Sequence, residues 1–131
     1  MSVWTKVQTK VLAKGVDMQI FTEAMKDLEL TLDYSKTELR NSYGKSTVDA
    51  MLRYQGKETA LGVVKTSEGG IDLLGDTWRS GIVRDNEHSK LVNMMSQAYQ
   101  AKKLKIELEA AGWDVKTVKK DNKIELDITQ W

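Results

Sequence analysis

DNEHSKLVNMMSQAYQAKKLKIELEAAG, residues 85–112, is the longest stretch of this chain with one helical pattern. Its apolar residues recur every three or four positions and are Leu91, Met94, Met95, Ala98, Ala101, Leu104, Leu108 and Ala111. This spacing places them on one face of an α-helix. Asp85 or Asn86 suits the N-cap, and Gly112 suits the left-handed residue that ends many helices. The pattern predicts a helix over about residues 87–111, with its apolar face buried from Leu91 to Leu108.

The segment after this helix has the pattern of a β-hairpin. Residues 113–120 and 123–131 alternate in polarity around Asp121-Asn122, which is typical of a two-residue turn. The apolar side chains of the second strand, Ile124, Leu126 and Ile128, are expected to face the core. On the other face, Glu125 and Asp127 are expected to meet Lys116 and Lys120 across the hairpin.

The segment before residue 30 predicts a strand and then a helix. Residues 3–11 alternate as a β-strand does, and Gly15 ends the pattern. Asp17 is a suitable N-cap, and Val16 and Phe21 occupy the two positions of a hydrophobic staple. A short amphipathic helix is therefore expected over residues 18–28.

The middle of the chain predicts four strands, at 30–34, 47–55, 60–66 and 71–74. The last three are separated by turn residues and should form a meander, while the polar segment 35–45 is expected to be mostly loop. The complete order is β-α-β-β-β-β-α-β-β. Two helices are too few for parallel crossovers, so we expect one α+β domain over residues 1–131, with an antiparallel β-sheet and two helices packed on one face.

Composition limits the function classes. The 131 residues contain 20 Lys and Arg against 19 Asp and Glu, and this net charge of +1 disfavours a nucleic-acid binder. Cysteine is absent, which excludes disulfides and thiolate sites. No signal peptide and no apolar run of about 20 residues is present, so a cytoplasmic protein without a membrane partner is expected.

The segment before the long helix contains the residue types of an anion site. Trp78, Arg79 and Arg84 lead into a helix N-terminus, where unpaired N–H groups favour a negative charge. Arginine can donate bidentate hydrogen bonds, and a tryptophan ring can stack on a base. Arg40 and Tyr43, from the other long loop, are expected to complete such a pocket. The alternative is that Trp78 packs on the core and the arginines are solvated.

Catalytic motifs are not recognisable. His88 is the only histidine, and no Gly-x-Ser-x-Gly motif or converging ligand set accompanies it. Gly44-Lys45-Ser46 lacks the glycine and the following helix of a phosphate-binding loop. We therefore expect no enzyme, no cofactor and no metal. Trp4, Trp113 and Trp131 lie in expected edge or terminal strands, where they serve either an interface or simple core packing.

Short motifs along nearly the whole chain resemble those of a known family. They are Met1-Ser2-Val3-Trp4-Thr5, Arg40–Thr47, Val48-Asp49-Ala50-Met51, Gly70–Trp78, Gln97-Ala98-Tyr99 and Gly112-Trp113. The chain resembles the uncharacterised family of hypothetical chloroplast reading frame thirty-five, which occurs in cyanobacteria, algal chloroplasts, other bacteria and phages. It departs from the family at Asn41-Ser42 and at Ile71, where the family has a glycine and a tyrosine. Members resemble companions of a MoxR-type AAA+ ATPase, so the resemblance implies an adaptor.

Two function classes follow from these observations. The first is a non-enzymatic binding protein whose partner is a second copy of itself, as a homo-oligomer, or another protein, as an adaptor. The alternative is a small-molecule binder, or a phage sponge, that sequesters an anionic nucleotide-like signalling ligand at the start of the long helix.

Overall fold

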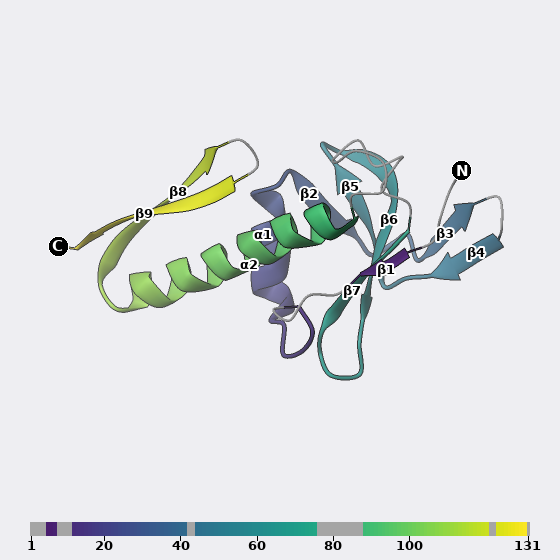
Figure 1. The fold of residues 1–131 in the computed structure, drawn as a ribbon, viewed down its shortest axis with the longest axis horizontal. Helices are drawn as coiled ribbons and strands as arrows, with labels where there is room; N and C mark the ends of the chain where they lie inside the picture. The colour runs from purple at the N-terminus through teal and green to yellow at the C-terminus, as the bar shows by residue number, and fades with distance from the viewer. Residues whose placement is uncertain (1–4, 8–11, 42–43, 76–87, 121–122, 131) are drawn as a thin grey trace.

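The computed structural model describes residues 5–7, 12–41, 44–75, 88–120 and 123–130, and two helices lie among its strands (Figure 1). In chain order they are β1 (Thr5–Val7), α1 (Met18–Lys26), β2 (Leu30–Asp33), β3 (Glu38–Asn41), β4 (Gly44–Thr47), β5 (Ala50–Tyr54), β6 (Lys57–Lys65), β7 (Ile71–Gly75), α2 (His88–Ala110), β8 (Trp113–Lys120) and β9 (Lys123–Gln130). The α+β class with antiparallel sheets is confirmed. Every predicted element is present in its predicted place, and β3 and β4 are two additional strands.

The main sheet has five antiparallel strands in the order β1-β7-β6-β5-β2. Its centre is the predicted meander of β5, β6 and β7. Gln55 and Gly56 connect β5 to β6 with φ values of 52° and 77°. Two successive left-handed residues are what a type I′ turn requires, and its twist matches that of the paired strands.

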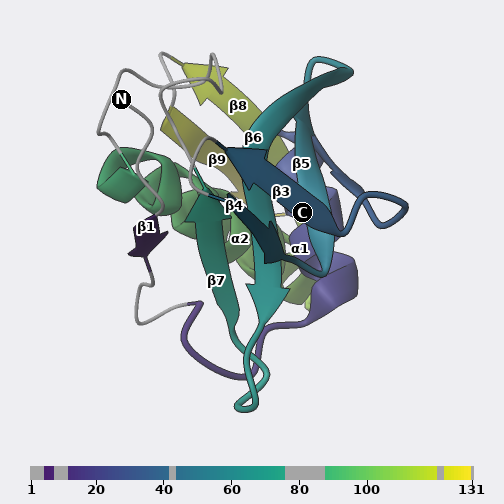
Figure 2. The same cartoon turned by 90° about the vertical axis from the view of Figure 1, so that its right-hand side faces the viewer.

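Both helices pack on one face of this sheet, as predicted, and lie behind it in the view of Figure 2. The core between the layers contains Phe21 and Met25 of α1, Leu91 and Met95 of α2, and inward-facing residues of the sheet such as Leu52. These side chains are at most 1% exposed. Burial of this apolar surface is the main force that holds helices and sheet together.

The start of α1 also has the predicted cap. The Asp17 carboxylate accepts hydrogen bonds from the N–H groups of Gln19 (3.0 Å) and Ile20 (3.3 Å). The Asp17 N–H donates to the Tyr99 hydroxyl at 3.0 Å, which links the beginning of α1 to α2. Local capping and long-range packing therefore agree at this position.

The segment 35–45 is not mostly loop, and this prediction was wrong. Glu38–Asn41 form β3, which pairs with β4 (Gly44–Thr47) as a separate two-stranded sheet. Leu39 of β3 is 2% exposed and packs with Val48 and Met51 in a small second core on the face of the sheet opposite the helices. The segment contains one large aliphatic residue, so its sequence has no visible alternation, and the strand depends on this distant contact.

The C-terminal hairpin is a third sheet that packs against α2 and does not join the main sheet. Lys116 pairs with Asp127 as predicted, but Lys120 lies opposite Lys123. The predicted turn residues, Asp121 and Asn122, lie outside the described residues. Figure 1 shows the hairpin lying along α2 beyond the main sheet.

The second half of α2 is less buried than its pattern predicts. Met95 and Ala98 are 0% exposed, whereas Leu108 is only half-buried. Ile128 of β9, which was expected to face the core, is 42% exposed. The reason is that this half of α2 extends beyond the main sheet and packs only against the hairpin. A sheet of two strands is too narrow to cover the helix fully.

Candidate functional site

The predicted anion site falls mostly outside the described residues. Trp78, Arg79 and Arg84 belong to residues 76–87, and Tyr43 belongs to residues 42–43, neither of which the structure describes. Arg40 lies in β3 with its Cα opposite that of Lys45. The grouping of these five residues stays a prediction.

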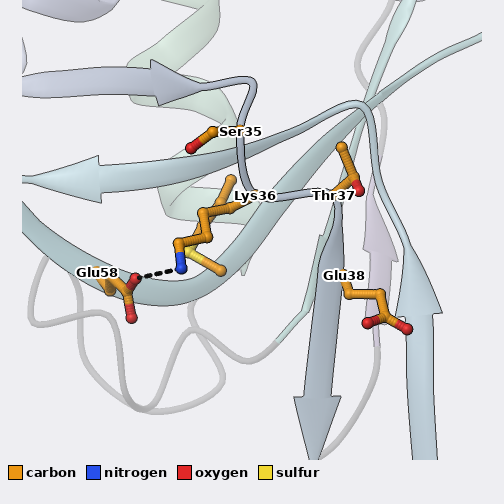
Figure 3. Close-up of a pocket in the computed structure, with 6 residues that line it drawn as sticks. Ser35, Lys36, Thr37, Glu38 and Glu58 are labelled. Atoms are coloured by element: carbon orange, nitrogen blue, oxygen red, sulfur yellow. Dashed lines mark ion pairs between the residues drawn. The ribbon is translucent and has the colours of Figure 1, made fainter.

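The described residues contain a polar cleft of about 430 Å³ next to the end of β2 (Figure 3). Its walls come from the segment that joins β2 to β3 and from the neighbouring β5 and β6. The lining residues are Ser35, Lys36, Thr37, Glu38, Met51 and Glu58. The cleft exists because β3 turns away from the main sheet to cover its second face.

Ion pairs connect the strands beside this cleft. Arg53 Nη1 lies 3.1 Å from Asp33 Oδ2 and 3.7 Å from Glu58 Oε1, and Lys36 Nζ lies 3.7 Å from the same Glu58 oxygen. The hydrogen bond from the Ser35 hydroxyl and the neighbouring Arg53 guanidinium keep the pKa of Asp33 below its ordinary value of 3.8. Asp33 is therefore ionised at neutral pH.

These contacts do not favour an anionic ligand in the cleft. Lys36 and Arg53 already pair with carboxylates, and Glu38 adds a negative charge that Lys45 accompanies at 3.3 Å. An incoming phosphate would compete with the carboxylates for the same donors. These ion pairs instead connect the end of β2 to the β5–β6 hairpin, which is a structural role.

A different surface has an unusual composition. Among the residues that the structure describes, five large hydrophobic side chains are exposed: Tyr34, Leu104, Ile106, Val118 and Ile128. The last four lie on the part of the molecule formed by α2 from Lys102 onward together with β8 and β9, which we call the C-terminal arm. Exposed apolar side chains that gather in one part of a molecule usually mark an interaction surface.

A groove of about 370 Å³ lies between α2 and β9, where the arm begins. Its lining residues are Gln97, Gln100, Ala101, Leu104, Leu126 and Ile128. Val115 of β8 is 4% exposed, whereas its Cα partner Ile128 in β9 is 42% exposed. Hence β8 is the better covered strand, and β9 borders the open groove.

Sequence reasoning missed the arm, although α2 contains a signal for it. Leu104 and Leu108 share one helical face, and Ile106 lies on nearly the opposite face because successive residues are 100° apart. Apolar residues on opposite faces of one helical segment are buried only if other parts of a protein pack against both faces. Of the tryptophans expected to serve either an interface or core packing, Trp113 is half-buried, and Trp4 and Trp131 lie outside the described residues.

The described part of the chain contains no group of three or more His, Asp or Glu side chains placed to hold a metal ion. None of its helices has the length and apolar character needed to cross a membrane.

Comparisons with known proteins find no matching family model, no similar curated protein and no similar solved structure. The resemblance to the family of chloroplast reading frame thirty-five stays a prediction.

Proposed function

We propose that this chain is a non-enzymatic binding protein that acts by associating with another protein chain through its C-terminal arm. The observation that carries the proposal is the concentration of exposed apolar side chains on the arm, which holds four of the five in the described residues. Single exposed hydrophobic residues are ordinary on soluble proteins, but a group in one part of the molecule is not.

The construction of the arm supports the same proposal. A two-stranded hairpin is marginally stable alone, and this one packs on a single helix. Leu104 and Ile128, on the two walls of the groove, are 44% and 42% exposed. A partner that covers them would remove apolar surface from water and stabilise the hairpin on α2.

Site-specific photo-crosslinking in the host cell tests this proposal. A photoreactive amino acid is placed at Leu104 or at Ile128 on the arm. The matched control is Tyr34, which is 50% exposed and directly follows β2, outside the arm. Efficient cross-links from the arm positions to one protein identified by mass spectrometry, or to a second copy, are expected, with little product from Tyr34.

Two results would overturn the proposal. One is the absence of protein cross-links from both arm positions. The other is equal cross-linking from Tyr34 to the same proteins, because random collisions would then account for the products.

A further inference from the structure

The second half of α2 has an uncovered stripe on the side opposite the groove. Lys103, Ile106, Glu107 and Ala110 have the spacing of one helical face, and all four are exposed. Ile106 is 45% exposed. The hairpin covers the other face of the helix, where Leu108 is half-buried.

This stripe continues the side of α2 that packs on the core. Ile106 follows Met95 by eleven residues, about three turns, so the two side chains point in nearly the same direction. Met95 is 0% exposed because α1 and the sheet lie against it. Lys102 Nζ lies 3.1 Å from Asp27 Oδ2, just after the end of α1. Beyond this ion pair α2 continues without α1, as Figure 1 shows.

The charges around Ile106 are ordered by sign. Lys102, Lys103 and Lys105 precede it, and Glu107 and Glu109 follow it. Of these, Lys102 pairs with Asp27. The other four make no ion pair with any residue in the described part of the chain. A helix of the same sequence in parallel register would set like charges side by side, whereas an antiparallel one sets basic against acidic residues.

We infer that the partner of this stripe is a second copy of the chain, with the two α2 helices packed antiparallel about a two-fold axis at Ile106. This inference rests on the proposed function and names the partner for the side of the arm opposite the groove. The axis brings the two Ile106 side chains together. It also places Lys103 of each copy beside Glu107 of the other, and Glu109 beside Lys105, so each contact occurs twice.

The free length of the helix fits this arrangement. From Lys103 to Ala110 the uncovered part is eight residues, about 12 Å long. It is bounded by the end of α1 at one side and by the turn at Gly112 at the other, so two such segments can overlap over their full length. The contact is small and partly polar, which predicts a weak, rapidly exchanging dimer.

Charge reversal tests the pairing. Lys103→Glu and Glu107→Lys each place two like-charge contacts in the homodimer and should weaken association roughly 10-fold, because each exposed pair contributes little alone. A mixture of the two variants restores both opposite-charge contacts between unlike chains. Analytical ultracentrifugation over a range of concentrations should therefore show heterodimers in the mixture at concentrations where each variant alone is monomeric.

The mixture separates this effect from one within the helix. Lys103 and Glu107 are four residues apart in the same helix, so either reversal also replaces a pair of opposite neighbouring charges inside one chain by a pair of like charges. Mixing cannot restore the pair of opposite charges. Lys57→Glu, an exposed reversal on β6, is the control and should leave the dimer unchanged. Circular dichroism checks that every variant is folded.

The inference is wrong if the mixture associates no better than its components, or if the parent protein stays monomeric at its highest soluble concentration. These failures differ from failure of the proposed function. A monomeric protein whose arm still cross-links to a different protein in the cell would retain the proposed function and overturn the second copy as partner.

Discussion

Replacing Leu91 with alanine should destabilise the protein about three times more than replacing Leu108, although both leucines lie on α2. Leu91 is 0% exposed and packs in the main core, whereas Leu108 is half-buried beneath the hairpin. Truncation of a fully buried leucine costs 2–5 kcal/mol, because it removes apolar contacts and leaves a cavity, and we expect about 3 kcal/mol for Leu91→Ala. For Leu108→Ala we expect about 1 kcal/mol, since water already reaches part of the side chain and can fill the space.

These free energies correspond to measurable shifts of the melting temperature. A chain of 131 residues has an unfolding entropy of about 0.28 kcal/mol/K at its midpoint. The midpoint should therefore fall by about 11 °C for Leu91→Ala and by about 4 °C for Leu108→Ala. Urea denaturation, followed by circular dichroism in dilute protein, gives the free energies directly, and an unchanged denaturant slope confirms that both variants unfold from the same native state.

Equal losses for the two variants would refute this reasoning, because they would mean that the second half of α2 is as well covered as the first. A larger loss for Leu108→Ala would refute it more strongly. Leu104 is 44% exposed, so Leu104→Ala should lower the free energy of unfolding less than Leu91→Ala or Leu108→Ala does.

Three further predictions concern single positions. Asp17→Ala should cost about 1 kcal/mol in urea denaturation, because it removes the cap of α1, whereas Asp17→Asn should retain most of the stability. Gly75→Ala should lower the melting temperature far more than Gly112→Ala: both glycines have positive φ, but a Cβ at Gly75 would overlap the backbone carbonyl of Ala60, and one at Gly112 would meet open space. Asp33→Asn should lower the stability at pH 7, and the difference from the parent should disappear in acid. The folded-state pKa of Asp33 is lowered from 3.8, so its contribution to the stability is present above that pH and is lost as the pH falls through the lowered pKa. Urea denaturation at pH 7 and at a series of falling pH values below 3.8 measures this loss.

Local sequence signals predicted most elements because each contains its own pattern. The Asp17 cap, the period of α1 and α2 and the alternation of β8 and β9 depend on residues near one another in the chain. The strand β3 has no such pattern, because one buried residue, Leu39, holds it against the second face of the sheet. A contact between distant segments is invisible to a search for local periodicity.

The candidate site shows the same division. The sequence predicted an anion site in the segment before α2, because arginines and an aromatic ring are residue types that bind anionic ligands. That site stays a prediction. The apolar surface of the arm needed the structure, because an isoleucine is ordinary in a sequence and unusual only when it is exposed. Whether Ile106 is buried depends on how far α1 extends along α2. The sequence of α2 alone does not predict where that contact ends.

By itself, the sequence determined the α+β class, the order of the predicted elements, the start of α1 and the end of α2, since capping residues and side-chain period are local features of the chain. Only the tertiary structure decided which faces are covered: β3 and β4 shield the second face of the sheet, the hairpin shields one side of α2, and the stripe at Ile106 stays open. Burial is set by whatever lies opposite a side chain, and in a folded chain that neighbour usually comes from far away in the sequence.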